Sequence, residues 1–365
     1  MNLKIKTFLR ILIILTMTVN LLACSSQAKP VSTVIIASAS KGGVWNPLAK
    51  EMARILPQYV PGVTFSDQET LGSLDNLKLL VSGKAQIVFA HDYHIARINQ
   101  GLLTSISASK VPVKILMGLY DQPLQIVIRK DAGINTLADL KGKRVSTGIP
   151  GGCAEEMAGF VLKSMNIDID KDVQRQKLDV LPSAAAIKDN QIDAFFWTGA
   201  MPTGTITKLF AENGSALELL SVDSASAELI MKDNPGVYHL SSVPAGGYPG
   251  LEKPIETLGI TAVLASLDTF PAELVSQVLP ALFDHRQELS GVWGGATKLS
   301  PFQSMNMLSD EALSFLHPAA TGYYLANLRT TASQKEIGEL WISKCMEAGH
   351  DGPACADSLL KFLKP

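Results

Sequence analysis

Segments typical of strands and of helices alternate through most of this chain, and small residues mark each change. β-branched runs alternate with stretches in which apolar residues recur at helical spacing. The first expected strands are 34–37, 63–68 and 85–90, and the expected helices are 47–56, 74–81 and one that begins at Tyr93. This βαβαβ order predicts an α/β fold with a parallel sheet, in which ligands bind at the carboxyl ends of the strands.

The alternation restarts after two further expected strands, 113–119 and 124–129, which predicts a second α/β unit that begins near residue 127. After the restart, the expected strands are 144–147, 177–181 and 194–197 and the expected helices are 153–165 and 184–188. A buried strand at 257–267 and an amphipathic helix at 271–289 follow, and we place both in the first unit because the second already has its core. The sequence therefore predicts two lobes, each a doubly wound sheet flanked by helices. Lobe I comprises 33–126 and 246–328, lobe II comprises 127–245, and the two crossings between them form a hinge beside a cleft.

The N-terminal residues decide the compartment. Lys4, Lys6 and Arg10 precede a short apolar run that closes with Leu-Leu-Ala-Cys, ending at Cys24. A basic start, an apolar centre and small residues before a junction are typical of a secretory signal peptide, here residues 1–23. The closing residues resemble the lipobox of bacterial lipoproteins, which implies a lipid on Cys24, a tether over 24–32 and an extracytoplasmic protein anchored to a bacterial membrane, facing the periplasm or the cell surface. The alternative is an ordinary secretory signal that contains a cysteine.

Charge and cysteine count narrow the classes of function. Three of the 32 basic residues leave with the signal and none of the 34 acidic ones, so the mature chain has a net charge of about −5. This charge argues against a nucleic-acid partner. Outside the cytoplasm, Cys345 and Cys355 are close enough in sequence to form a disulfide. Cys153 is then left alone, either buried or lining a site.

Three loops share one design, in which a strand end, small residues and a helix start follow one another. The loops are 37–45, 70–73 and 148–154. Small residues let a ligand approach the backbone, and unpaired N–H groups at a helix start favour an anion. Hydroxyl groups come from Ser38, Ser40, Thr70 and Ser73. Lys41 either adds positive charge or is a solvated loop lysine. The alternative is that the glycines and serines of these loops only form turns and helix caps. Four aromatic residues near strand ends or turns either wall a pocket or belong to the core: Trp45, Tyr120, Trp197 and Tyr248.

The titratable residues near these loops do not form a recognised catalytic or metal site. His91 and His94 have the i, i+3 spacing of a zinc pair, but no third ligand has diagnostic spacing, so we expect no metal. His91 is more plausible as a hydrogen-bond donor to a ligand. Glu155 and Glu156 stand where carboxylates usually satisfy a helix dipole. No nucleophile elbow, phosphate loop or dinucleotide motif occurs, and we therefore expect neither an enzyme nor a cofactor.

Several segments resemble, in order, the TAXI-type solute-binding proteins of TRAP transporters, over residues 33–328. Residues 40–47, S-K-G-G-V-W-N-P, resemble the family's S-T-G-G-V-Y-Y-P, and 119–124, L-Y-D-Q-P-L, resemble L-Y-P-E-P-L. The remaining similar segments are L-A-D-L-K-G-K-R-V at 137–145, D-A-F-F-W-T at 193–198 with Pro202 and Thr203, P-A-G-G-Y-P-G at 244–250, and H-P-A-A at 317–320 with Tyr323 and Tyr324.

This resemblance implies a type II, Venus-flytrap periplasmic binding protein of two lobes. Such a receptor captures a small organic anion or an amino acid and delivers it to the membrane subunits of a TRAP transporter. The family's ligand contacts carry over to the following residues: Ser38, Ser40, Gly42, Gly43, Val44, Trp45, Thr70, Ser73, Tyr120, Gly151, Gly152, Cys153, Ala154, Trp197 and Thr198.

Departures from the family pattern point to a different ligand from the glutamate-like compounds of some members. The family's G-S-G-T loop is G-G-C-A at 151–154, its Tyr-Tyr pair is Trp45 and Asn46, a threonine is Lys41, and its Ser-Asp is His91 and Asp92. Residues 329–365 form a C-terminal extension beyond the resemblance. Two alternatives remain open: a ligand-sensing lipoprotein for a membrane kinase, and an extracytoplasmic enzyme on the same scaffold.

Overall fold

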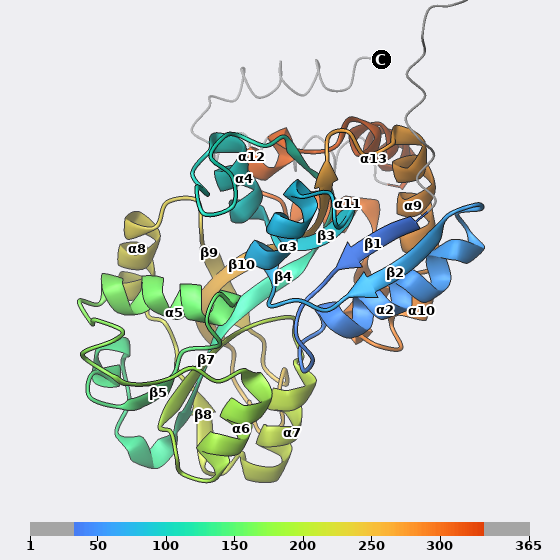
Figure 1. Cartoon of the computed structure of the whole chain (residues 1–365). Helices are drawn as coiled ribbons and strands as arrows, with labels where there is room; N and C mark the ends of the chain where they lie inside the picture. Colours follow the sequence, from blue (N-terminus) through green and yellow to red (C-terminus); the bar gives the residue numbers. More distant parts are fainter. Residues whose placement is uncertain (1–32, 332–365) are drawn as a thin grey trace, which may run out of the picture. The chain divides into compact units, whose positions relative to one another are not determined.

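The computed structural model describes residues 33–331 (Figure 1). The predicted signal peptide, the lipid site at Cys24, the tether before Thr33 and the predicted Cys345–Cys355 disulfide all lie outside the described residues. Among the helices of the described part, none combines the length and the apolarity needed to cross a membrane.

A mixed β-sheet of ten strands forms the centre of the described part. Its order is β2-β1-β3-β10-β4-β7-β5-β6, with β8 beside β4 and β9 beside β10. The strands are β1 (Thr33–Ala37), β2 (Thr64–Gln68), β3 (Ile87–His91), β4 (Val113–Arg129), β5 (Arg144–Ser146), β6 (Gln174–Gln176), β7 (Ala194–Thr198), β8 (Leu217–Leu219), β9 (His239–Val243) and β10 (Ile255–Leu267).

Helices lie on both faces of this sheet, so the predicted α/β class with a sheet flanked by helices is confirmed (Figure 1). The α-helices are α2 (Trp45–Ile55), α3 (Ser73–Val81), α4 (Asp92–Gln100), α5 (Cys153–Ser164), α6 (Val180–Lys188), α7 (Gly204–Asn213), α8 (Ser224–Asp233), α9 (Ala272–Asp284), α10 (Arg286–Leu289), α11 (Pro301–Asn306), α12 (Asp310–Ser314) and α13 (Pro318–Thr331). Short 3-10 turns cover Leu56–Gln58, Lys130–Ala132, Leu137–Leu140 and Gly294–Lys298.

The predicted parallel pairing holds among β1, β2 and β3, but the sheet as a whole is mixed. β1 pairs in parallel with β2 and β3, but β10 runs antiparallel to both β3 and β4, and β7 runs antiparallel to β4. The long strands β4 and β10 lie side by side in the middle of the sheet, between β3 and β7. Local sequence patterns do not specify whether such a strand runs parallel or antiparallel to its neighbours.

β4 is one strand where the sequence predicted two. The stretch Asp121–Gln122–Pro123 reads as a break, yet β4 continues through it and changes partner there. It pairs with β10 up to Pro123 and with β7 from Leu124 onward. A proline has no N–H to donate, and a point where the pairing changes tolerates that loss.

The change of partner divides the strands into two groups, which we call the first and second strand groups. The first contains β1, β2, β3, β9, β10 and β4 up to Pro123; the second contains β5, β6, β7, β8 and β4 from Leu124. We count α2, α3 and α4, with the loops beside them, with the first group, and α5, α6, α7 and α8 with the second, because they adjoin those strands in the chain. The change lies close to the predicted first crossing at 126–127. The assignment of lobes I and II with a hinge stays a prediction.

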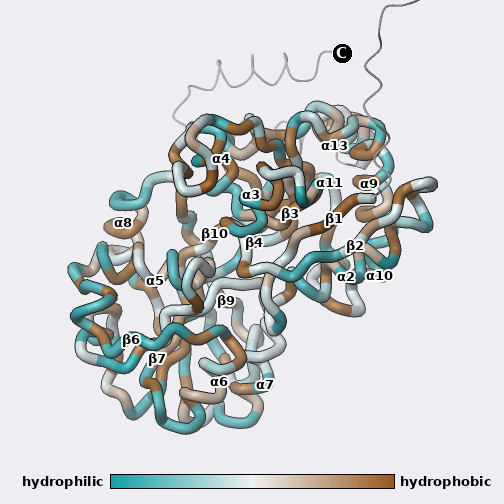
Figure 2. Tube along the Cα trace, in the orientation of Figure 1, coloured by the Kyte–Doolittle hydropathy of each residue, from teal (hydrophilic) through white to brown (hydrophobic). Residues whose placement is uncertain are grey.

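Alternating side chains of β4 and β7 fill two cores on opposite faces of the second strand group. Ile126 and Phe196 pack with α5 and α8 on one face, whereas Val127 and Phe195 pack with α6 and α7 on the other. This period of two is what places apolar side chains on both faces of a buried strand. Figure 2 shows hydrophobic stretches in the strands at the centre of the fold.

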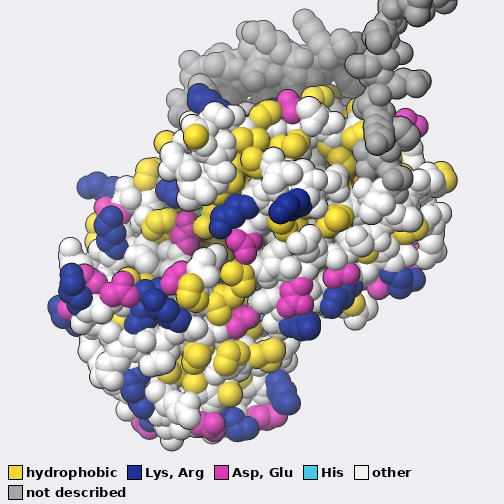
Figure 3. Space-filling view, in the orientation of Figure 1, with side chains coloured by type: hydrophobic (Ala, Val, Ile, Leu, Met, Phe, Trp, Pro, Cys, Tyr) yellow, Lys and Arg dark blue, Asp and Glu magenta, His cyan; other side chains and the backbone are white. Residues whose placement is uncertain are grey.

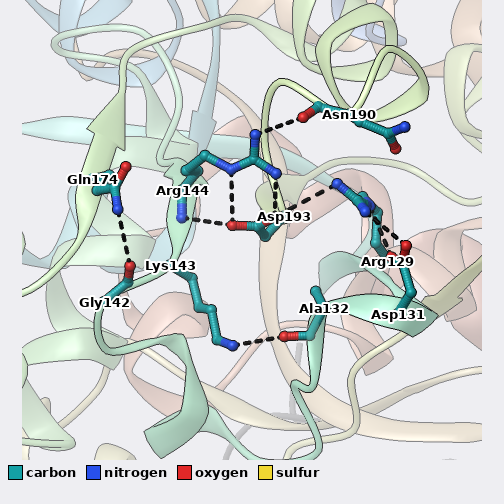
Figure 4. Close-up of polar contacts among 9 residues, drawn as sticks. All are labelled: Arg129, Asp131, Ala132, Gly142, Lys143, Arg144, Gln174, Asn190 and Asp193. Atoms are coloured by element: carbon teal, nitrogen blue, oxygen red, sulfur yellow. Dashed lines mark hydrogen bonds and ion pairs between the residues drawn. The ribbon is translucent and has the colours of Figure 1, made fainter.

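A partly buried carboxylate, that of Asp193, links the ends of β4, β5 and β7 (Figure 4). Asp193 accepts hydrogen bonds from the Arg144 backbone N–H at 3.0 Å and from its Nε at 3.1 Å. Arg129 lies 3.7 Å from the same carboxylate and also binds Asp131. Hydrogen bonding from Arg144 lowers the pKa of Asp193 despite partial burial. These charged contacts link the ends of β4, β5 and β7 within the second strand group.

On the face shown in Figure 3, basic and acidic side chains are interspersed.

Two further local predictions are wrong. The expected strand 177–181 is a loop that leads into α6, because Asp179 caps that helix by accepting the Val180 N–H at 2.8 Å. The expected single helix 271–289 is two helices, α9 and α10, separated at His285.

Candidate functional site

A cavity of about 70 Å³ lies at the carboxyl ends of β1, β3, β5 and β7. One water needs roughly 10–15 Å³ measured in this way, so the space suits a small organic molecule. Its described lining comes from all three predicted loops and from two later segments. The lining residues are Ala39, Ser40, Gly43, Val44, Trp45, Leu71, Gly72, His91, Gln122, Gly148, Ile149, Gly152, Cys153, Ala154, Leu178, Asp179, Val180, Phe196, Trp197, Thr198, Gly199 and Ala200.

Three helices begin at this cavity without a side-chain cap. The N-caps of α2, α3 and α5 are Val44, Gly72 and Gly152, and none of them caps its helix through a side-chain hydrogen bond. The first N–H groups of a helix have no partner within it, and the helix dipole adds partial positive charge there. Three uncapped helix starts at one cavity therefore favour a ligand that accepts hydrogen bonds.

The first turn of α5 carries two carboxylates, but both are engaged elsewhere. Glu155 accepts the Gly151 N–H at 2.7 Å and forms an ion pair with Arg175. Glu156 faces α4. Neither residue is among those that line the cavity.

Three buried side chains of the lining have a polar atom without a hydrogen-bond partner. These atoms are Trp45 Nε1, His91 Nδ1 and Thr198 Oγ1. A buried polar group left unpaired costs about 1–3 kcal/mol, and native structures keep few of them. Unpaired donors and acceptors around one cavity are what a polar ligand would satisfy.

His91 is neutral, and its partner fixes its tautomer. Burial and, to a lesser extent, the neighbouring His94 lower the pKa of His91 to about 3. His91 Nε2 lies 2.8 Å from Gln122 Oε1. An amide oxygen only accepts, so Nε2 carries the proton and Nδ1 is a bare acceptor. In this tautomer the free nitrogen of His91 would accept a hydrogen bond from a ligand rather than donate one, and contact between His91 and a ligand stays a prediction.

In the described part of the chain, no lysine or arginine lines the cavity. The one carboxylate among the described lining residues is that of Asp179. One oxygen of this carboxylate accepts the Val180 N–H at the start of α6. The aromatic rings of Trp45, Phe196 and Trp197 contribute to the apolar wall. A ligand with several negative charges would find no cation here to balance it.

Direct contacts join the two strand groups on both sides of the cavity. On one side, Glu156 Oε2 of α5 accepts from the Tyr93 hydroxyl at 2.8 Å and lies 2.9 Å from His94 Nε2, both of α4. On the other, the Thr205 hydroxyl donates to the Gly42 carbonyl at 3.3 Å. Trp197 also lies against Gly43, where an added Cβ would meet its ring at 3.4 Å. The cavity thus lies between residues of both groups and remains partly open to solvent.

The model of the NMT1-like family matches residues 36–325. This chain belongs to the NMT1-like family.

Solved structures with a similar arrangement include three binding proteins from bacteria. The periplasmic aliphatic sulphonate binding protein SsuA from Escherichia coli is 12% identical over 82% of this NMT1-like chain and 90% of its own, with a TM-score of 0.44. The alkanesulfonate-binding protein SsuA from Xanthomonas axonopodis pv. citri, bound to MOPS, is 16% identical over 87% and 94%, with a TM-score of 0.43. MatC from Rhodopseudomonas palustris, with bound malate, is 14% identical over 73% and 90%, with a TM-score of 0.49.

The cavity of this NMT1-like protein brings together ten of the residues predicted to contact a ligand. They are Ser40, Gly43, Val44, Trp45, His91, Gly152, Cys153, Ala154, Trp197 and Thr198. Whether each contacts a ligand stays a prediction.

The other predicted residues do not line the cavity: Ser38, Lys41, Gly42, Thr70, Ser73, Tyr120 and Gly151. The hydroxyls of Ser38 and Thr70 donate to backbone carbonyls, of Gln68 and of Ser38 respectively, and so hold the loops in shape. Lys41 is exposed and lies 3.7 Å from Glu69. Ser73 accepts the His91 N–H at 3.2 Å.

Two of the four aromatic residues belong to the core. Tyr120 packs on Trp293 with ring centroids 4.3 Å apart, and burial holds its pKa well above the usual range. Tyr248 donates to the Gln125 side chain and receives the Thr203 N–H at 3.2 Å. Both are explained by packing rather than by ligand contact.

Sequence reasoning missed several lining residues. Gln122 sits in the middle of β4, where the sequence predicted a break. Leu178 and Val180 fall in the expected strand 177–181, where the structure has a loop and the first turn of α6. Gln122 lies within the L-Y-D-Q-P-L segment, which was the available signal for it.

The chemistry of Cys153 and the acidic residues does not favour catalysis. Burial raises the pKa of the Cys153 thiol well above its usual range, and the nearby Glu156 raises it further. A thiol held in this way is a poor nucleophile. In the described part of the chain, no three His, Cys, Asp or Glu side chains are grouped so that they could hold a metal ion.

Proposed function

We propose that this protein is an extracytoplasmic solute-binding receptor that captures a small organic anion or an amino acid in the cavity described above. The observation that carries the proposal is the convergence of three uncapped helix starts, α2, α3 and α5, on a cavity whose buried Trp45, His91 and Thr198 each hold an unpaired polar atom. An acidic group of the ligand accepts hydrogen bonds from the N–H groups there.

The absence of lysine and arginine from the described lining limits the charge of the ligand. Each helix start supplies about half an elementary charge, which falls off within its first turn. Three such starts supply about one and a half charges, which favours a ligand with one negative charge over a tricarboxylate. A monocarboxylate, a sulfonate or a zwitterionic amino acid fits this balance.

Ligand capture proceeds by hinge closure of the two predicted lobes. The ligand touches residues of both strand groups, for instance Trp45 from the first and Trp197 from the second. It stabilises the closed form through contacts that the open form cannot make, and only such differential contacts shift the equilibrium.

Delivery to the membrane subunits of a TRAP-type transporter, with the receptor held at the membrane by a lipid on Cys24, is the finer part of the proposal. It rests on the resemblance of residues 33–328 to TAXI-type receptors and on the lipobox-like junction. Anchoring raises the local concentration of the receptor beside its transporter. Binding of the loaded receptor to vesicles that contain those subunits tests this part.

Native mass spectrometry of the freshly purified mature protein tests the receptor itself. We expect a mass increment from a retained small molecule that disappears after unfolding and refolding. Small-angle scattering with calorimetry should then show compaction and heat when the same molecule is returned. If the protein carries no small molecule and none of a pool of organic acids and amino acids compacts it, the receptor proposal fails.

A variant that fills the cavity sharpens the experiment. Ala154→Leu places three extra carbon atoms at a buried lining position in the first turn of α5. We expect it to abolish the mass increment and the compaction. Ala225→Leu, on an exposed position of α8, is the matched control and should bind as the unaltered chain does.

A further inference from the structure

The free nitrogen of His91 carries information about the ligand beyond its acidic group. The imidazole is buried, lines the cavity and has one of its two nitrogens in a hydrogen bond with Gln122. The other nitrogen, Nδ1, has no partner. Because Nε2 holds the proton, Nδ1 offers a lone pair and accepts a hydrogen bond.

His91 lies beside the group that binds the acidic end. The Trp45 and His91 rings have centroids 4.9 Å apart, and Trp45 is the first residue of α2, one of the uncapped helix starts. Trp45 Nε1–H is a donor and His91 Nδ1 is an acceptor. Two complementary groups on neighbouring rings match a ligand whose acceptor and donor stand on adjacent carbon atoms.

We propose that His91 selects ligands that carry a hydroxyl or amino donor on the carbon next to their carboxylate, which makes them 2-hydroxy or 2-amino carboxylates. The inference rests on the proposed solute-binding function and names the class of solute. The carboxylate faces the helix starts and Trp45, and the adjacent O–H or N–H donates to His91 Nδ1. A carboxylate without the donor leaves Nδ1 buried and unpaired.

The experiment compares matched ligands by calorimetry on the mature chain after retained ligand has been removed by unfolding and refolding. The probes are lactate, alanine and propanoate, and a longer series of 2-hydroxyhexanoate, 2-aminohexanoate and hexanoate. In each series we expect at least one donor-bearing member to bind about tenfold more tightly than the donor-free acid, since an unpaired buried acceptor weakens binding by about that factor or more. The hydroxyl and amino arms show which donor is preferred.

His91→Phe keeps an aromatic ring but removes the acceptor, so the affinities within a series should become equal. Trp45→Phe is the matched control, because it removes the neighbouring donor and should weaken all members of a series alike. His91→Asn keeps an acceptor and serves if the phenylalanine variant does not fold; it should retain a preference for the donor-bearing acids.

Any of three calorimetric results overturns the inference. The first is that the unaltered chain binds the donor-free acid as tightly as both donor-bearing acids. The second is that His91→Phe keeps the preference for donor-bearing acids, and the third is that no probe of either series binds. The receptor proposal stands or falls separately, on the retained small molecule and the compaction that it causes. A retained ligand with no donor next to an acidic group would leave that proposal intact and refute the role of His91.

Discussion

Glu156 should contribute a pH-dependent part of the stability of this protein. It is the one carboxylate of the α4–α5 contact described above, and it binds Tyr93 and His94 across the boundary between the strand groups. Its side chain is 20% exposed. Burial alone would raise its pKa, but the charge and hydrogen bond of His94 and the hydrogen bond of Tyr93 outweigh burial and bring the pKa to about 2.

The magnitude follows from the difference between the folded and ordinary pKa values. A carboxyl whose pKa falls from 4.5 to about 2 on folding stabilises the folded state by about 3 kcal/mol where it is ionised in both states. Because the folded pKa is the lower one, this stabilisation is fully present above pH 4.5 or so and is lost as the pH falls through about 2. At pH 3 about half of it should remain.

Urea denaturation of the Glu156→Gln variant measures this contribution. His94 attracts the carboxylate only while it is protonated, so both measurements are made at acidic pH. The amide keeps an acceptor for Tyr93 but loses the charge, so we expect the free energy of unfolding to fall by up to about 3 kcal/mol at pH 5 and by about half as much at pH 3. Glu252→Gln, on an exposed residue, is the control and should change little at either pH. A loss that is equal at pH 5 and pH 3, or no larger than that of the control, would refute the reasoning.

Two further predictions concern packing and reactivity. Gly118→Ala should destabilise the protein by at least about 2 kcal/mol, because the added Cβ would lie 2.4 Å from a backbone oxygen of α11. Gly159→Ala lies inside α5 with open space around it and should stabilise the protein by about 0.5–1 kcal/mol. Thermal or urea unfolding of the two variants measures both changes in stability. The high pKa of the Cys153 thiol predicts slow alkylation by iodoacetamide at pH 8 in the folded protein and rapid alkylation in urea, measured on its own peptide by mass spectrometry, and equal rates in both states would contradict it.

Local patterns in the sequence predicted the three loops correctly because each loop is specified by residues that adjoin it. A buried run ends, small residues follow, and a helix begins, and the chain needs no distant partner to do this. The three loops meet because the ends of parallel strands share one edge of the sheet. The cavity at that edge was therefore within reach of sequence reasoning.

The direction of β10 and the continuity of β4 were not within reach. Both depend on pairing between residues more than a hundred positions apart, such as Ala262 with Tyr120. A proline locally favours a break in a strand, which is why a break was expected at Pro123. Pairing with β10 up to Pro123 and with β7 after it keeps β4 continuous. Strand propensity depends on this kind of context more than helix propensity does.

Hydroxyl groups near the loops were harder to assign than the loops themselves. Ser38, Thr70 and Ser73 have the right chemistry for a ligand, yet their hydroxyls bind neighbouring backbone or the His94 ring. Short polar side chains in loops commonly bond to backbone nearby, and sequence alone does not separate that use from ligand contact. Gln122 is the converse case, since a residue inside a strand reaches the cavity.

The contacts between the two strand groups oppose any opening of the cavity through which a ligand would enter. If the strand groups separate, Glu156 loses Tyr93 and His94 and Gly42 loses Thr205. On opening, the carboxylate gains water in place of those partners, as it does on unfolding, so the loss of this contact adds at most the contribution of Glu156 to folding to the cost of opening. A ligand that satisfies Trp45, His91 and Thr198 adds to the closed form only. Weakening the α4–α5 contact should therefore lower affinity for every ligand by a common factor, whereas changes at His91 should alter the ratio between ligands.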